Sequence, residues 1–218
     1  MKALVFLRAQ LVTGGMAAVF ALSGCAVGRN VLPVEIDAGR NPPQGTAVRI
    51  DAVEDARVFT ANPPDRETPS LGGAEIGNKS ITSRVVALKR NTLGMTMGDV
   101  LLPEGSSVAG LVQAAVTRGL RESGYRVLGA GDAGYEQAVP IKLRVEQFWS
   151  WSSTGAFAIT LRNRAVVAAQ GGISPLAQGR TFSSRAEAST QLTTQDDWLA
   201  IVAKGLDALT AAAKEGLR

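Results

Sequence analysis

The chain has 218 residues, with 23 lysines and arginines against 19 aspartates and glutamates, so its formal net charge is only +4. This weak, scattered positive charge argues against nucleic-acid binding. The sequence has no histidine, which excludes Ser-His-Asp and Cys-His catalysis and histidine-based zinc sites. Its single cysteine allows no disulfide within the chain.

Residues 1–24 have the pattern of a bacterial lipoprotein signal peptide. Lys2 and Arg8 form a short positive region before an apolar stretch over residues 9–22, which is too short and too interrupted for a permanent membrane span. Its ending, Leu-Ser-Gly-Cys25, resembles a lipobox, in which Cys25 becomes the first residue of the mature chain and its thiol receives the lipid. The alternative is an ordinary secretory signal cut near Ala26, with an incidental cysteine.

A lipid on Cys25 predicts where the protein resides. Two or more acyl chains, palmitate among them, attach a protein stably to a membrane. Ala26, in place of aspartate, resembles the sorting pattern of lipoproteins sent to the outer membrane. We therefore expect a lipid-anchored protein that faces the periplasm. Residues 25–45 are predicted to be the lipidated cysteine and a flexible tether, because Asn41-Pro42-Pro43 breaks regular structure. This tether either holds the body away from the membrane or packs along the body.

The first half of the body, within residues 46–218, mixes clear and unclear patterns. Residues 46–53 predict a strand, because apolar residues alternate with charged ones. Residues 60–105 form a poorly readable insert, rich in proline and glycine. Residues 107–122 predict an amphipathic helix capped by a serine and followed by a short strand. A strand, a helix and a strand in this order predict a parallel pair.

The second half shows a more regular pattern. Alternation over residues 141–145, 157–161 and 182–188 predicts an antiparallel meander with one apolar face. A terminal helix is expected from about Gln195, with Thr194 as its N-cap. Together these elements predict a single α+β domain with two layers, in which two helices pack on one face of a mixed β-sheet.

Two short motifs accompany this order of elements. Asp55-Ala56-Arg57 follows the first strand, and Gly124-Tyr125-x-Val127 joins the helix to the next strand. With the lipobox, these motifs and the element order resemble the YajG family of uncharacterised bacterial lipoproteins over roughly residues 46–215. The resemblance implies an outer-membrane lipoprotein with a periplasmic α/β body and no established activity.

Polar motifs in the body favour structural roles. Residues 129–134 match the spacing G-x-G-x-x-G, but no helix is expected to open there, so we predict a glycine-rich turn and no cofactor. The acids Asp51, Glu54 and Asp55 allow a hard-cation site. A local ion pair of small energetic weight between Asp55 and Arg57 is the favoured alternative, and no metal is expected.

Two tryptophans offer the best candidate for a partner contact. Trp149 and Trp151 have the same parity as the apolar residues of the 141–145 strand, which predicts burial under a helix. If they instead protrude at the hairpin tip, they are suited to bind a protein or lipid.

Three functions remain open on the sequence alone. The leading hypothesis is a non-enzymatic binding or accessory module that is anchored in the envelope and contacts another envelope protein. An auxiliary subunit of an ABC-type lipid-transport system is the alternative, and it predicts an apolar groove. A carboxylate enzyme ranks last, and it predicts two acids facing each other across a cleft.

Overall fold

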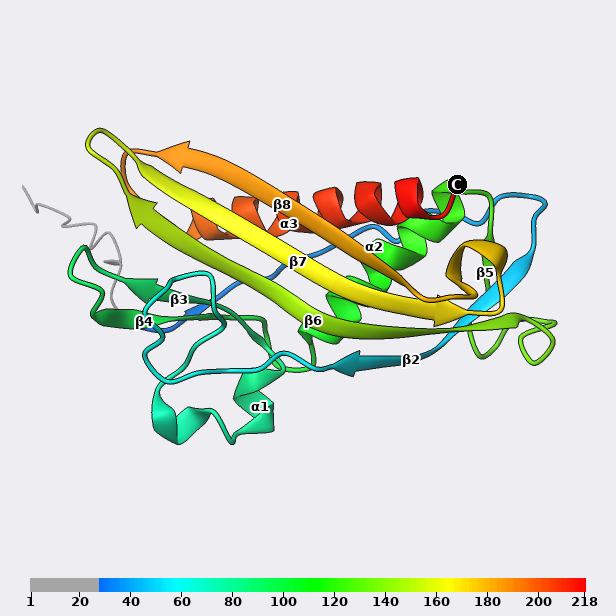
Figure 1. Cartoon of the computed structure of the whole chain (residues 1–218), viewed down its shortest axis with the longest axis horizontal. Coiled ribbons are helices and arrows are strands. Elements are labelled where there is room, and N and C mark those ends of the chain that lie inside the picture. Colours follow the sequence, from blue (N-terminus) through cyan, green and yellow to red (C-terminus); the bar gives the residue numbers. More distant parts are fainter. Residues whose placement is uncertain (1–27) are drawn as a thin grey trace, which may run out of the picture.

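The protein, described here by a computed structural model over residues 28–218, is an eight-stranded mixed sheet with two long helices on one face (Figure 1). The predicted signal peptide and Cys25 lie outside the described residues. The strands are β1 (Asn30–Val31), β2 (Ala47–Asp55), β3 (Val85–Arg90), β4 (Thr96–Leu101), β5 (Arg126–Val127), β6 (Val139–Thr154), β7 (Ile159–Gly171) and β8 (Arg180–Thr190). The helices are α1 (Lys79–Thr82), α2 (Val108–Glu122) and α3 (Gln195–Gly216). The predicted α+β class is confirmed.

The 16-residue strand β6 is the centre of the sheet. One of its edges pairs with β2 near its start and touches β3 near its end, while its other edge pairs with β7 along most of its length. β4 and β1 extend the sheet beyond β3, and β8 closes the opposite side beyond β7. β6, β7 and β8 are antiparallel, which confirms the predicted meander.

The parallel pairing around α2 is also as predicted. β2 and β5 are parallel, with Ala47 opposite Arg126. The side chain of Ser107 accepts a hydrogen bond from the backbone N–H of Gly110, and thereby caps α2. Gly124 has φ +92°, a left-handed conformation that ends the helix at little cost for glycine.

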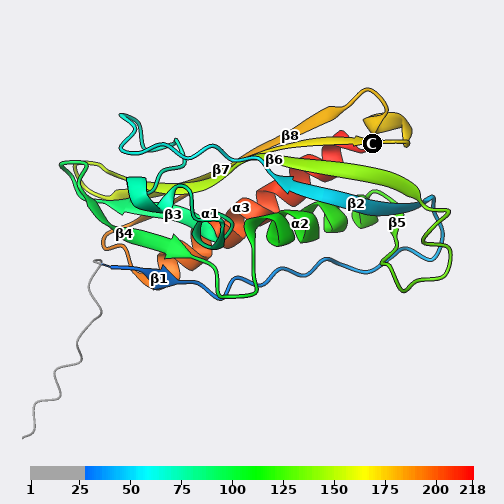
Figure 2. The ribbon, with the colours of Figure 1, turned by 90° about the horizontal axis from the view of Figure 1, so that it is seen from below.

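α3 begins where the sequence predicts. Thr194 is its N-cap and forms a reciprocal capping box with Asp197. The buried stripe of α3 faces β7, β8 and α2 and includes the residues expected for it: Trp198, Ile201, Val202, Leu206 and Leu209. Figure 2 shows α2 and α3 running side by side along the sheet. None of the helices in residues 28–218 is long and apolar enough to cross a membrane.

One sequence expectation about these elements is wrong. Phe157, expected in a strand, is 90% exposed in the β6–β7 turn, because Thr154 pairs with Ile159 and leaves the residues between them outside the ladder. The segment over residues 60–105, poorly readable in the sequence, contains α1, β3 and β4. Its apolar side chains pack on the sheet face opposite the two long helices, so that face is covered as well over part of its length.

Candidate functional site

The predicted pair of Asp55 and Arg57 is present at the end of β2. Nε and Nη2 of Arg57 donate to the two carboxylate oxygens of Asp55, each at 2.8 Å. The Arg57 side chain is completely buried, whereas that of Asp55 is 21% exposed. The ion pair is therefore confirmed, but it is not the exposed pair of small weight that the sequence analysis expects.

Backbone carbonyl groups accept hydrogen bonds from the remaining N–H groups of Arg57. Nη2 donates to Thr82 O at 2.6 Å, and Nη1 donates to Val85 O at 2.7 Å and Phe148 O at 3.3 Å. The guanidinium has five N–H donors, and these bonds account for all of them. Arg57 thus joins β2, the insert and β6, and it has no donor left for a ligand.

Trp149 and Trp151 are buried, but on the face opposite to the one predicted. A β-bulge between Val145 and Gln147 adds one residue to β6 and reverses its alternation. Phe148 consequently continues the helix-covered face, while the tryptophans point into the insert-covered cluster. They are 1% and 8% exposed, so the suggestion that they protrude as a partner contact is wrong.

The insert closes over Trp149 through specific contacts. The indole Nε1 of Trp149 donates to Arg66 O at 3.2 Å. The ring of Phe59 meets Trp149 edge-on with centroids 6.1 Å apart, and the Arg57 guanidinium lies 5.2 Å from the centroid of the Phe59 ring. The tryptophans therefore hold the insert on the sheet.

The acidic cluster is divided among arginines. Asp51 pairs with Arg49, Glu54 pairs with Arg144, and Asp55 pairs with Arg57. Within residues 28–218 no group of three or more acids or cysteines is arranged to hold a metal ion. The glycine motif at residues 129–134 forms a turn, as predicted, in which the Asp132 carboxylate accepts from Gly129 N–H.

Several cavities open on the surface of the described part of the chain. Three of them, with volumes of about 510 to 640 Å³, are open depressions lined by charged residues such as Arg144, Arg164 and Lys79. A more apolar cavity of about 280 Å³ lies where Met97, Ile159 and Trp198 come together. This volume is just below the roughly 300–1,000 Å³ typical of ligand pockets, and the transport alternative, with its apolar groove, stays a prediction.

The N-terminal segment, residues 28–45, is part of the folded body. β1 pairs in parallel with β4, and Leu32 N–H donates to Leu101 O at 2.8 Å. Leu32 is fully buried, Val34 is nearly so, and Ile36 packs against the same core. Of the two alternatives for the tether, the described part therefore packs along the body, and the domain begins before residue 46.

The start of this segment is fixed at one point on β4. Gly28 N–H donates to Met97 O at 2.7 Å. The backbone of Gly28 lies so close to Gly98 that any side chain at position 98 would overlap it, and Gly98 has φ +140°. Arg29 binds both carboxylate oxygens of Asp99, at 2.6 and 2.9 Å, and also Glu75 at 2.7 Å. The hydrogen bonds to Asp99 and Glu75 raise the pKa of Arg29 above its ordinary value.

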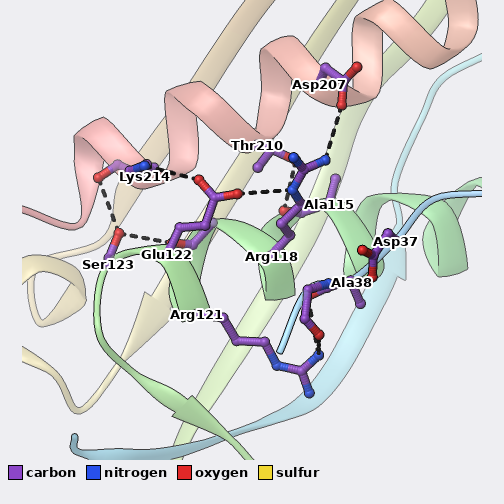
Figure 3. A network of polar contacts seen from close by, with 12 residues as sticks. Asp37, Ala38, Ala115, Arg118, Arg121, Glu122, Ser123, Asp207, Thr210 and Lys214 are labelled. Atoms are coloured by element: carbon purple, nitrogen blue, oxygen red, sulfur yellow. Dashed lines mark hydrogen bonds and ion pairs between the residues drawn. The ribbon is translucent and has the colours of Figure 1, made fainter. Parts of the chain in front are cut away.

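The far end of the segment is held by α2 and β5. Nη1 of Arg121 donates to the carbonyl oxygens of Ala38 and Gly39, at 3.1 and 2.7 Å (Figure 3). The side chain of Asn41 accepts from Val127 N–H at 2.8 Å and donates to Val127 O at 2.9 Å. Side-chain hydrogen bonds of Asn41 and Arg121 thus hold residues 38–41 beside β5 and the end of α2.

A second polar network in the same region joins α2 to α3 (Figure 3). Glu122 accepts from Arg118 at 2.9 Å and from Lys214 at 3.0 Å, and these hydrogen bonds lower the pKa of its carboxyl. Thr210 Oγ1 donates to Ala115 O at 3.1 Å. The helix that holds the N-terminal segment is therefore itself fixed to α3.

Sequence reasoning missed Arg29, Asn41 and Arg121, which dock the N-terminal segment. A signal was present, because Leu32, Val34 and Ile36 alternate with other residues as a half-buried extended segment does. The run Asn41-Pro42-Pro43 that follows instead favours a flexible tether. The partners of the polar residues, which lie about 70 to 80 positions away in the chain, had no local signal.

Comparisons with known proteins leave the family of this chain unassigned. No protein-family model matches it, and no curated protein does. A crystal structure of an uncharacterised protein has a TM-score of 0.43 and 11% identity, and the match covers 88% of this chain and 99% of that one. A minor lipoprotein from Acinetobacter baumannii has a TM-score of 0.31 and 13% identity over 50% of this chain and 86% of that one. Both TM-scores are too low for the likenesses to carry a functional argument, and the YajG resemblance stays a prediction.

Proposed function

We propose that this protein is a lipid-anchored bacterial envelope lipoprotein that acts as a non-enzymatic binding or accessory module. Cys25 carries the acyl chains, and the body faces the periplasm from the outer membrane, as in the YajG family that the sequence resembles. The observation that carries the proposal is the lipobox-like ending Leu-Ser-Gly-Cys25, and the docked N-terminal segment gives this anchor a fixed place on the body. The segment fixes Gly28, three residues after Cys25, at one defined point of the body.

The polar groups of the body support a role in binding rather than in catalysis. The sequence lacks histidine, the donors of Arg57 all serve backbone or Asp55 oxygens, and the clustered acids have separate arginine partners. A lipid anchor confines such a body to a thin layer, which raises its effective concentration for partners in the same membrane. We expect an envelope protein as the partner, and neither nucleic acid nor a cofactor.

The anchor is tested by the intact mass of the mature protein. Expression of the full chain in a Gram-negative host should give a product that starts at Cys25, carries acyl chains and sediments with the outer membrane. The variant Cys25→Ser should lack the acyl mass and leave the membrane fraction. A wild-type product that is cut near Ala26 and has no acyl mass would refute the anchor.

The partner is tested by photo-crosslinking in intact cells. A photo-reactive residue replaces Arg185, whose side chain is 70% exposed on β8. The matched control replaces Trp151, which is only 8% exposed and is expected to give no intermolecular adduct. One reproducible protein adduct from position 185, absent at 151, supports the binding module. If no adduct forms at position 185, at position 151 or at further exposed positions along β7 and β8, the binding-module proposal is contradicted.

A further inference from the structure

Three turns of the chain meet at one end of the molecule. They are the β3–β4 turn over residues 91–95, the β6–β7 turn over residues 155–158, and the β8–α3 connection over residues 191–194. Both ribbon views place them at the end opposite β5 and the C-terminus (Figures 1 and 2). One cavity is lined by residues of the first and third turns, Asn91, Thr92, Leu192 and Thr193, and by the two strand residues that flank the β6–β7 turn, Thr154 and Ile159.

These turns expose large apolar side chains. Leu93 is 80% exposed, Met95 57%, Phe157 90% and Leu192 71%. Val31, 47% exposed in β1, lies at the same end, because its carbonyl accepts from Gln195 at the start of α3. Among residues 28–218 the one other large apolar side chain with comparable exposure is Val58. Exposed apolar groups thus gather at a single end, as at sites of interaction with a membrane or a protein.

The turns also lack charge. Their sequences are Asn-Thr-Leu-Gly-Met, Gly-Ala-Phe-Ala and Gln-Leu-Thr-Thr, without an acidic or basic residue. The turn between β5 and β6, at the opposite end, carries Asp132 and Glu136. In the β7–β8 connection, also at that end, the apolar residues Ile173 and Leu176 are buried. Uncharged apolar tips enter the interfacial layer of a bilayer without the cost of desolvating a charge.

The position of the anchor indicates that the surface in contact with these turns is a lipid bilayer. Gly28 is bonded to Met97 and lies against Gly98, in β4 just after the β3–β4 turn. Gly28 lies three positions after Cys25, and this stretch spans at most about 11 Å when fully extended. Acyl chains on Cys25 would therefore enter a membrane close to these turns.

We propose that the end formed by residues 91–95, 155–158 and 191–194 rests on the phospholipid surface, with Leu93, Met95, Phe157 and Leu192 inserted into it. This docking rests on the proposed lipid anchor. The long axis of the body then points away from the membrane, and the end that carries β5 and the C-terminus reaches into the periplasm. The body stands upright because both its anchor and its turns hold the same end.

The test uses the full, lipidated protein in phospholipid vesicles. Phe157→Cys and Leu93→Cys are labelled with an environment-sensitive fluorophore, and quenching by lipids brominated on their acyl chains is measured. Val58→Cys is the matched control, since residue 58 is an apolar residue of 75% exposure away from the turns, and Ala133→Cys reports on the opposite end. The wild type controls for labelling, because an acylated Cys25 offers no thiol.

Lipid docking predicts quenching of about half or more of the emission at residues 93 and 157, because inserted groups lie about 5–10 Å deep in the headgroup and acyl boundary. Residues 58 and 133 should be quenched much less. Equal, weak quenching at all four positions in vesicle-bound protein would overturn the docking while leaving the anchor intact. Shielding of residues 93 and 157 in cell envelopes but not in vesicles would also overturn it, in favour of a protein partner. A wild type that takes up the label and does not float with vesicles would refute the anchor itself.

Discussion

The two faces of the sheet are covered in different ways. On one face, α2 and α3 pack over regular rows of apolar residues from β2, β6, β7 and β8. On the other face, the mostly irregular segment between β2 and β3, residues 56–84, covers a smaller cluster around Trp149 and Trp151. The first face is held mainly by repeated apolar contact, whereas the second also depends on a few polar bonds, above all those of Arg57. Irregular structure needs such fixed points because it has no internal ladder of hydrogen bonds.

Removal of Arg57 is expected to have the largest effect on the insert-covered face. Arg57→Met should lower the free energy of unfolding by about 3–5 kcal/mol, because it leaves the carbonyls of Thr82 and Val85 without their donor and Asp55 without its counter-charge. Denaturant unfolding measures this loss. The control Arg144→Met removes the exposed pair with Glu54 and should cost less than about 1 kcal/mol. Equal losses in both variants would contradict the role of Arg57.

Neighbouring residues of β6 should separate the two faces. Phe148→Ala and Trp149→Ala should each cost about 3–5 kcal/mol, since both side chains are buried. Hydrogen exchange distinguishes them. The loss of Trp149 should speed exchange in the insert around residues 59–88, whereas the loss of Phe148 should spare the insert and act on the helix-covered face. Identical exchange maps for the two variants would show that the bulge does not divide the cores.

On the helix-covered face, close packing rather than hydrogen bonding determines which substitutions are tolerated. A Cβ at Gly205 of α3 would overlap the amide of Asn163 in β7. Gly205→Ala should therefore cost about 1–3 kcal/mol by overpacking, although alanine favours a helix. The control is Gly110→Ala in α2, where the new Cβ meets only the Ser107 side chain at 3.3 Å and should cost less. A stabilised Gly205→Ala variant, measured by thermal unfolding, would refute tight packing there.

The smallest expected effect concerns the network between the helices. Hydrogen bonds from Lys214 and Arg118 lower the pKa of Glu122 in the folded protein. Its contribution to stability is therefore present at neutral pH and is lost as the pH falls below the ordinary range of a glutamate carboxyl, through the lowered folded-state value. Glu122→Gln should cost about 0.5–1 kcal/mol at neutral pH and approach the wild type in acid. A pH-independent difference between the two denaturation midpoints would contradict this.

The sequence predicted the regular parts of the fold because periodicity is a local signal. α2, α3 and the β6–β8 meander follow from spacings of two, three and four residues. The bulge in β6 could not be foreseen, because one inserted residue leaves the composition unchanged and reverses the faces of Trp149 and Trp151. The end of β2 was partly predictable, since Asp55 and Arg57 are close in sequence, but the carbonyls that bury Arg57 come from distant segments.

The docked N-terminal segment is central to this account, and hydrogen exchange of the mature protein tests it most directly. The Leu32 amide, bonded to Leu101 O at 2.8 Å, should exchange as slowly as the amide of Leu102, which is bonded to Arg84 O at 3.0 Å. That result would mean that the anchor leaves the body at a fixed point beside the three apolar turns. Exchange of Leu32 at the rate of an unprotected amide, with Leu102 still protected, would mean that the segment is a free tether, and it would contradict the account.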